Sequence, residues 1–236
     1  MLYYFSVVFK GDKYLPKYGE YFISKNYSIS EVLDVIDSGN SIHRKITVPE
    51  GLTTKQIIDV VLSNQHLKGE IEIDFHNLEG MLLPETYFFN SGYSRNDLLN
   101  RMKNEMEKTL EEKWNMRDQN LPYSNKIEAL VLASMIESET GAAPERKLIA
   151  SVFVNRLRKN MKLQSDPTVV YGLEKNNNIE IKKLKRSHLK IDHQWNTYTR
   201  KGLPKSPICN PGKKSIEAVM KPFNTDYLYF VSDDKG

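Results

Sequence analysis

Two acidic residues, Glu137 and Glu139, stand at the end of an apolar segment that begins at Lys126. The segment favours a helix, with Ser124 as its N-cap and Gly141 as the residue that ends it. At about 100° per residue, Glu139 projects from the more apolar side of that helix, and Glu137 points roughly 200° away. A carboxyl group on an apolar face loses hydration, which raises its pKa and keeps a proton available near neutral pH. Glu139 is therefore a candidate general acid.

A purely structural explanation fits the same pair of glutamates. A glutamate at a helix end often pairs with an arginine of the next segment, and Arg146 or Arg156 would serve. Pro144 suits the first turn of a second helix, and Asn160 marks the place where that helix should end. The spacing alone leaves both interpretations open.

Composition restricts the classes of function. The 236 residues carry a net charge of +4, from 34 basic and 30 acidic side chains, which is too weak an excess to indicate a nucleic-acid binder. Cys209 is the single cysteine, so neither an internal disulfide nor a cysteine-based metal site is expected. No segment approaches the ~18 apolar residues of a membrane-spanning helix. Leu2–Phe9 is too short for one and lacks the features of a signal peptide.

The first 70 residues contain a weak internal repeat of two strand–helix units. The first helix opens with Ser28 and Glu31 and the second with Thr53 and Gln56, in both cases a capping-box pattern. The expected strands that precede them are Glu20–Ser24 and Lys45–Val48. We expect a small α+β module, typical of binding or positioning.

Further elements are expected along residues 71–236. Leu78 to Phe89 should pack as a buried loop whose acids emerge at a surface, because Gly80 and Pro84 interrupt regular structure. The other expected elements are a strand at Ile71–Phe75, an amphipathic helix at Ser94–Met116 with a buried stripe at Leu98, Met102, Met106 and Leu110, a short helix at Ser215–Met220 and a strand at Asp226–Ser232.

Two polar loops have the chemistry of a sugar-binding site. In the first, Gln164 and Asp166 could meet hydroxyl or acetamido groups, although Asp166 could also act as the N-cap of a helix starting at Pro167. The second, Trp195–Gly212, combines aromatic planes with amide and hydroxyl groups, and its prolines could equally serve packing alone. Glu79 and Glu85 are further acids, for which hydrogen bonds to loop backbone are the simpler explanation.

Five segments in order resemble the motifs of the MltG/YceG-like endolytic murein transglycosylases, from about Gly19 to the end of the chain. They are LEGMLLPETY, LASMIESETGAAPERKLIASVFVNRL, LQSDPTVVYGL, NTYTRKGLPKSPICNPG and TDYLYFVSD. The resemblance implies an α+β protein: a small LysM-like strand–helix module at residues 1–70, N-terminally incomplete, followed by a mixed α/β catalytic domain at residues 71–236, C-terminally incomplete.

The resemblance also implies a reaction. Family members cleave the β-1,4 bond between N-acetylmuramic acid and N-acetylglucosamine, form a 1,6-anhydro-muramic end and so terminate elongation of nascent glycan strands. The catalytic acid of the family matches Glu139, and no cofactor is implied. Peptidoglycan strands are the implied partner, with the cell-wall elongation machinery as a further one, and the implied location is the outer side of the bacterial cytoplasmic membrane. The matching substrate-cleft positions are Gln164, Ser165, Asp166, Asn196, Thr197 and Tyr198, with Glu79 and Glu85 as additional candidates.

Three other functions remain open at this point. A lysozyme-like hydrolase would use Glu139 as acid and Asp166 or Glu137 as a second carboxylate. A non-catalytic module would bind peptidoglycan without cleaving it. A nucleic-acid site would have to use the basic stretch at residues 182–190, but that stretch lacks interleaved aromatic residues and reads better as a solvated loop.

Overall fold

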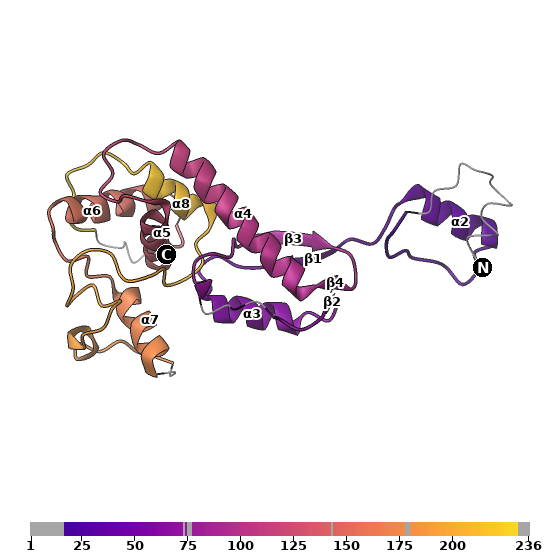
Figure 1. Ribbon diagram of the computed structural model, residues 1–236, viewed down its shortest axis with the longest axis horizontal. Coiled ribbons are helices and arrows are strands. Elements are labelled where there is room, and N and C mark those ends of the chain that lie inside the picture. Colours follow the sequence, from indigo (N-terminus) through magenta and orange to yellow (C-terminus); the bar gives the residue numbers. More distant parts are fainter. Residues whose placement is uncertain (1–16, 73, 75–76, 143, 178–179, 231–236) are drawn as a thin grey trace.

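The computed structural model describes residues 17–72, 74, 77–142, 144–177 and 180–230. The chain forms an elongated molecule with helix α2 at one end, a middle lobe built around α3 and two small sheets, and a helical lobe of α5 to α8 at the other end (Figure 1). The expected α+β class is confirmed. The elements are α2 (Ile29–Ser38), β1 (Arg44–Thr47), α3 (Thr54–Ser63), β2 (Leu67–Lys68), β3 (Thr86–Phe89), β4 (Tyr93–Ser94), α4 (Arg95–Asn115), α5 (Lys126–Glu139), α6 (Arg146–Arg158), α7 (Asp166–Asn177), the 3-10 turn η3 (His188–Lys190) and α8 (Lys213–Met220).

Both sheets of the middle lobe are two-stranded pairs. β1 runs antiparallel to β3, with Ile46 opposite Tyr87, and β2 runs parallel to β4, with Leu67 opposite Tyr93. β1 lies within one residue of the predicted strand at 45–48. The four residues of β3 were predicted to lie in a buried loop, and that prediction is wrong because they pair with β1. The β1–β3 pair joins residues on either side of the domain boundary predicted near residue 70, and that boundary stays a prediction.

The two predicted capping boxes are present. The Ser28 hydroxyl accepts a hydrogen bond from the Glu31 N–H, and the Glu31 carboxylate accepts one from the Ser28 N–H. Thr53 and Gln56 make the same reciprocal pair at the start of α3. Both helices therefore begin where local side-chain chemistry satisfies their first backbone donors.

Three predicted strands are wrong where the structure describes them. Residues 20–24 form no strand, and neither do Ile71, Glu72 and Asp74, while the rest of that prediction lies outside the described residues. Residues 226–230 are likewise not a strand, and 231–232 are not described. Alternating apolar residues favour an extended backbone, but a strand also requires a neighbouring strand to accept its hydrogen bonds. At residues 225–228 no strand of the described residues lies alongside. The backbone carbonyls there accept hydrogen bonds from two side chains of α6, Asn155 and Arg156.

Helix α4 connects the two cores of the molecule. Its 21 residues span about 31 Å. Leu98 and Met102, near its start, pack in the core of the middle lobe, whereas Met106 and Leu110 pack in the core of the helical lobe. These four residues are at most 1% exposed, as the amphipathic pattern predicted. The lobes are therefore joined by a continuous buried stripe.

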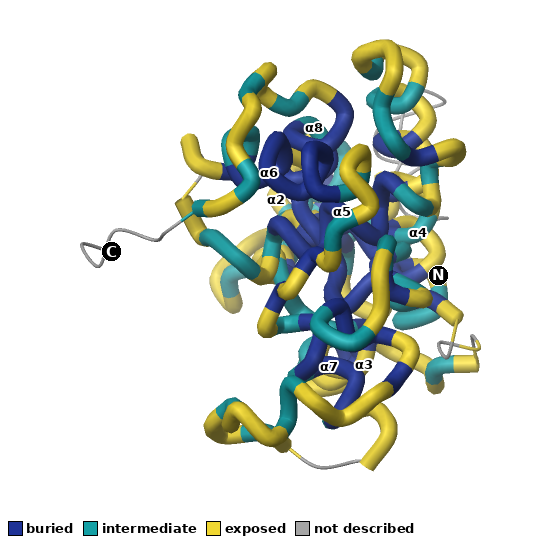
Figure 2. The backbone as a smooth tube through the Cα atoms, turned by 90° about the vertical axis from the view of Figure 1, so that its left-hand side faces the viewer, coloured by how far each residue is buried: buried dark blue, intermediate teal, exposed yellow. Residues whose placement is uncertain are grey.

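The helical lobe is built around α5, which lies with α6 and α8 in the buried interior (Figure 2). The N-cap of α5 is Asn125 and not Ser124 as predicted, because the Asn125 Oδ1 accepts hydrogen bonds from both Ile127 and Glu128 N–H at 3.0 Å. At its other end α5 passes into extended backbone at Thr140, and Gly141 follows the helix end as predicted, although without the positive φ of a glycine C-cap.

Helix α6 ends as predicted. Asn160 has a φ of 52°, and the N–H groups of Asn160 and Met161 bond to the carbonyls of Leu157 and Arg156. This is a Schellman motif, which fixes the direction of the loop that follows.

A buried asparagine, Asn210, links the lobes. Its Oδ1 accepts a hydrogen bond from the Leu82 N–H at 2.9 Å, and its Nδ2 donates to the Leu52 carbonyl at 3.0 Å and to Thr54 Oγ1 at 3.2 Å. Its backbone bonds to Leu52 and Gly51 as well.

Within the described ranges, no helix of the protein is both long enough and apolar enough to cross a lipid bilayer.

Candidate active site

Glu139 is the last residue of α5 and lies half-buried at the edge of the helical lobe. Its Oε1 accepts a hydrogen bond of 2.5 Å from Ser165 Oγ. Burial raises the pKa of Glu139, the Ser165 hydrogen bond lowers it, the nearby Asp166 charge raises it and Arg156 lowers it. The net direction is upward, because loss of hydration is the largest of these effects. Among the described residues, Glu139 has no ion-pair partner.

Glu137 has a different environment, although it stands only two positions earlier. Its side chain is 4% exposed, and its carboxylate accepts hydrogen bonds of 2.9 Å from Arg146 and from the Gly212 N–H. Arg146 is also buried and reaches Glu50 at 3.3 Å. The arginine-paired interpretation therefore applies to Glu137, and the interpretation as an available acid applies to Glu139.

The two polar loops identified in the sequence meet directly behind Glu139. Ser165 donates its backbone N–H to Thr197 Oγ1 at 2.9 Å, and the Gln164 N–H donates to the Thr197 carbonyl at 3.1 Å. Gln164 has a φ of 52°, an uncommon conformation for a residue with a side chain. This turn aims the Ser165 hydroxyl at the carboxylate of Glu139.

Asn196 and Thr197 form the framework of the second loop. Both are almost fully buried, and the Asn196 amide donates to the carbonyls of Leu189 and Ile191. Its Oδ1 accepts the N–H of Tyr198. The substrate-binding role predicted for Asn196 and Thr197 stays a prediction, and the bonds that they make shape the loop around Ser165.

Asp166 and Tyr198 form a polar pair next to Glu139. The Tyr198 hydroxyl donates to Asp166 Oδ1 at 2.5 Å, and the Asp166 side chain is exposed. Burial raises the pKa of Tyr198, and Asp166 adds to that shift. The expected N-cap role of Asp166 is wrong, because α7 begins at Asp166 itself and its carboxylate bonds to the tyrosine. The carboxylate therefore remains within reach of a ligand at Glu139.

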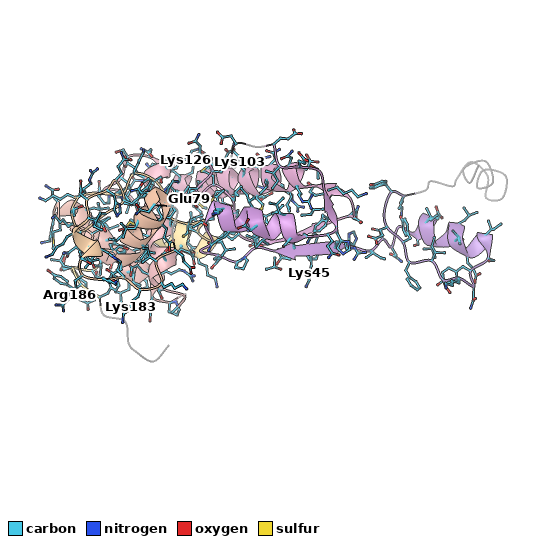
Figure 3. The ribbon with its side chains drawn as sticks, turned by 90° about the horizontal axis from the view of Figure 1, so that it is seen from below. Lys45, Glu79, Lys103, Lys126, Lys183 and Arg186 are labelled. Carbon is cyan, nitrogen blue, oxygen red and sulfur yellow. The ribbon has the colours of Figure 1, made fainter. Side chains whose placement is uncertain are left out.

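Glu79 and Glu85 lie apart from this group. Glu79 is located where the lobes meet (Figure 3), and it accepts hydrogen bonds from the Thr54 N–H at 3.0 Å and the Tyr171 hydroxyl at 3.1 Å. Burial raises the pKa of Glu79. Glu85 is exposed and pairs with Lys213 at 3.3 Å. The backbone bond to Glu79 comes from the first residue of α3 and not from a loop, and the predicted place of Glu79 and Glu85 in the substrate cleft stays a prediction.

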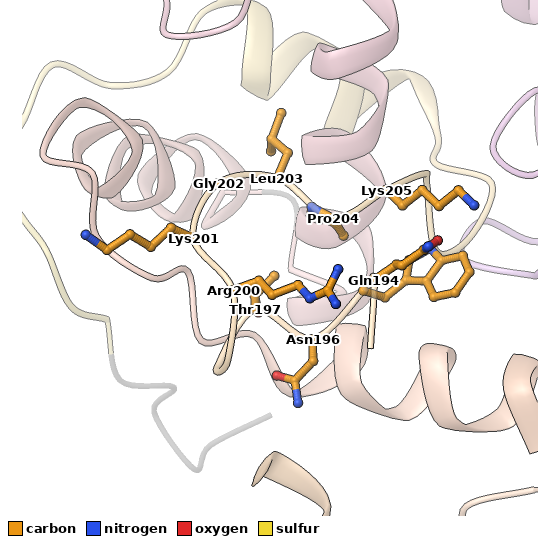
Figure 4. A pocket seen from close by; sticks show the side chains of 10 residues that line it. Gln194, Asn196, Thr197, Arg200, Lys201, Gly202, Leu203, Pro204 and Lys205 are labelled. Carbon is orange, nitrogen blue, oxygen red and sulfur yellow. The ribbon is translucent and has the colours of Figure 1, made fainter. Parts of the chain in front are cut away.

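A pocket of about 400 Å³ opens beside Thr197 on the second loop (Figure 4). Its lining residues are Gln194, Trp195, Asn196, Thr197, Arg200, Lys201, Gly202, Leu203, Pro204 and Lys205. Sequence reasoning did not single out Arg200, Lys201 or Lys205. The sequence does show three cations within six residues of this loop. The basic run at 182–186 is longer and drew the attention instead, but the structure shows that it is mostly exposed.

Known proteins resemble this chain over most of its length. A family model described as the YceG-like family matches residues 2–236. A protein of Bacillus subtilis (strain 168) named endolytic murein transglycosylase is 32% identical over 248 residues, which cover 92% of this chain and 67% of that protein. A protein of the same name from Streptococcus pneumoniae serotype 2 (strain D39) is 27% identical over 266 residues, which cover 92% of this chain and 46% of that protein.

A solved structure resembles the fold. The crystal structure of a YceG-like protein from Listeria monocytogenes matches with a TM-score of 0.66 at 29% sequence identity, covering 97% of this chain and 83% of that one.

Proposed function

The chain belongs to the YceG-like family, and on that premise we propose that it is an endolytic lytic transglycosylase of peptidoglycan. The reaction would cleave the β-1,4 bond between N-acetylmuramic acid and N-acetylglucosamine. The observation that carries the proposal is Glu139, a half-buried carboxyl group without an ion-pair partner among the described residues, whose pKa is raised by burial. This combination suits a general acid.

Glu139 would act twice in the reaction. Protonated Glu139 donates its proton to the glycosidic oxygen as the bond to the muramic C1 breaks. The resulting carboxylate then takes the proton of the muramic C6 hydroxyl while that oxygen bonds to C1. The C6 hydroxyl belongs to the same sugar, so its proximity favours it over water. The product is a 1,6-anhydro ring, and Glu139 ends the cycle protonated.

The neighbouring groups would support both steps. Ser165 donates to the Glu139 carboxylate at 2.5 Å, which orients it and stabilises its charged form after proton donation. The Asp166 charge acts in the opposite direction and holds the proton on Glu139 before the reaction. Glu139 can therefore donate a proton when protonated and accept one when ionised.

A second candidate, a hydrolase, is favoured by the position of Asp166. Its exposed carboxylate is close enough to Glu139 to raise the pKa of that acid, and in a hydrolase it would activate water or attack C1. The other expected second carboxylate, Glu137, is unsuited to this role, because its two oxygens are engaged by Arg146 and the Gly212 N–H.

Three finer features of the proposal come from the family. They are a LysM-like module in the N-terminal part, attachment to the cytoplasmic membrane with the catalytic part outside, and contact with the elongation machinery. The chain spans 67% and 46% of the two named relatives, so activity of the whole protein belongs to the proposal as well.

The test is the chemistry of the product ends. Purified glycan strands are incubated with the wild type, with Glu139→Gln and with Glu128→Gln, and the products are analysed by mass spectrometry. Glu128 lies on the first turn of α5, about 16 Å along the helix from Glu139, and serves as a matched control.

We expect anhydro-muramic ends, lighter than reducing ends by one water, from the wild type and the control but not from Glu139→Gln. Reducing ends would instead establish the hydrolase. Strand binding without cleavage by any of the three proteins would refute catalysis and leave a peptidoglycan-binding module.

A further inference from the structure

The pocket beside Thr197 is strongly cationic at its rim. Arg200, Lys201 and Lys205 line it, and none of its ten lining residues is acidic. The Arg200 guanidinium is already engaged, since it makes bonds of 2.9 and 2.8 Å to the two oxygens of Asp192. Two ammonium groups, from Lys201 and Lys205, therefore remain to meet a ligand.

The two lysines are held apart on a rigid loop. In Figure 4 they extend to opposite sides of Arg200. The Lys205 N–H bonds to the Gln194 carbonyl, and its ammonium lies 5.9 Å from the ring centre of Trp195. Trp195 is itself fixed by a 3.0 Å hydrogen bond from its indole nitrogen to Ser206. The pocket wall is thus held by backbone and indole hydrogen bonds that do not involve the ammonium groups.

The pocket is connected to the acid by one residue. Thr197 lines the pocket and, through its Oγ1, accepts the N–H of Ser165, whose hydroxyl in turn holds Glu139. The pocket and the acid therefore lie on neighbouring segments of the same hydrogen-bonded loop pair. Muramic acid differs from the other sugar of the strand in carrying a lactyl group and a peptide with free carboxylates.

We propose that this pocket binds the peptide attached to the muramic acid at the cleaved bond, with Lys201 and Lys205 each meeting a different carboxylate of that peptide. The inference rests on the proposed function. Lysine provides a mobile point charge on a flexible stem, which suits a carboxylate on a flexible peptide better than a fixed bidentate site. The interaction is exposed, so salt should weaken it.

The experiment compares kcat/KM on peptide-bearing strands and on strands stripped of peptides by an amidase. We expect the wild type to prefer peptide-bearing strands by about fivefold, the order given by two exposed charge pairs. In the double variant Lys201→Ala/Lys205→Ala the ratio should fall toward one. The matched control, Lys182→Ala/Lys183→Ala, removes two exposed charges outside the pocket lining and should keep the wild-type ratio.

A second readout separates this inference from the proposed function. Binding of a fluorescent, peptide-bearing glycan fragment is measured by anisotropy in the Glu139→Gln background, with and without the two lysine substitutions. Weaker binding in the lysine variant supports the pocket even if no protein cleaves the strands. Equal binding, or an unchanged substrate ratio in an active enzyme, overturns it while leaving the reaction intact.

Discussion

The same Glu→Gln substitution should change stability in opposite directions at Glu137 and Glu139. The side chains of Glu137 and Arg146 are 4% and 5% exposed. Breaking a buried ion pair leaves one charge unpaired and costs about 3–5 kcal/mol. Glu50 still contacts Arg146 but is 42% exposed, so it offsets at most about 1 kcal/mol. Glu137→Gln should therefore lower the free energy of unfolding by about 2–4 kcal/mol and Tm by about 4–16 °C.

Glu139→Gln should stabilise the protein at neutral pH. The folded-state pKa of Glu139 is raised above its unfolded value, so the native state holds the proton more tightly. As pH rises from the unfolded-state pKa to the folded-state pKa of Glu139, the wild type loses stability. The loss is complete above the folded-state pKa. The substitution removes this loss, so it should raise the free energy of unfolding at neutral pH and leave it unchanged below the usual carboxyl pKa.

Urea denaturation at pH 7 and at pH 4, followed by circular dichroism, measures both effects, with Glu112→Gln, at an exposed position of α4, as the control. Replacing Glu137 and Arg146 together by Met should recover part of the stability, because no fully buried charge is then left unpaired. Recovery should be incomplete, since Glu50 loses its partner Arg146 and the Gly212 N–H loses its acceptor. The reasoning is refuted if Glu137→Gln costs less than about 1 kcal/mol, or if Glu139→Gln is destabilising at pH 7.

Two further predictions concern the acid and a turn. Asp166→Asn removes a negative charge that raises the pKa of Glu139, so the alkaline limb of kcat/KM against pH should move to lower pH. Ser165→Ala removes a hydrogen bond that lowers the same pKa and should move the limb to higher pH, and a common profile for both variants would contradict this electrostatic account. Gly80 and Gly69 both have a φ of 81°, but only at Gly80 would a new Cβ meet a proline side chain, at 2.5 Å. Gly69→Ala should cost about 1–2 kcal/mol in thermal or urea unfolding and Gly80→Ala measurably more, whereas equal losses would show that the turn has room.

Local signals in the sequence were sufficient for the helices. Ser28, Thr53 and Asn160 each act on backbone groups within a few residues, so their patterns identify helix ends without knowledge of the rest of the fold. The stripe along α4 was likewise predictable, because the helical period alone selects its buried face. The N-cap of α5 was misplaced by one residue, since Ser124 and Asn125 are both good caps.

Pairings between distant segments were not predictable in the same way. An extended segment becomes a strand only when another segment lies beside it, and β1 found its partner some 40 residues later. For the site, helical geometry predicted different surroundings for Glu137 and Glu139, which the structure shows, and the catalytic role of Glu139 stays a prediction. The contact of Ser165 with Glu139 depends on a left-handed turn at Gln164 and on Thr197, which no local pattern announces.

The buried Asn210 has a consequence for how the protein is made. It provides hydrogen bonds to Leu82 and Leu52, which precede it by 128 and 158 positions. At about 5–20 residues per second, a ribosome needs roughly 6–26 s to proceed from Leu82 to Asn210. Until then the buried groups of the middle lobe lack their partner. The lobe that is synthesised first can therefore be completed only after Asn210 has been added to the chain.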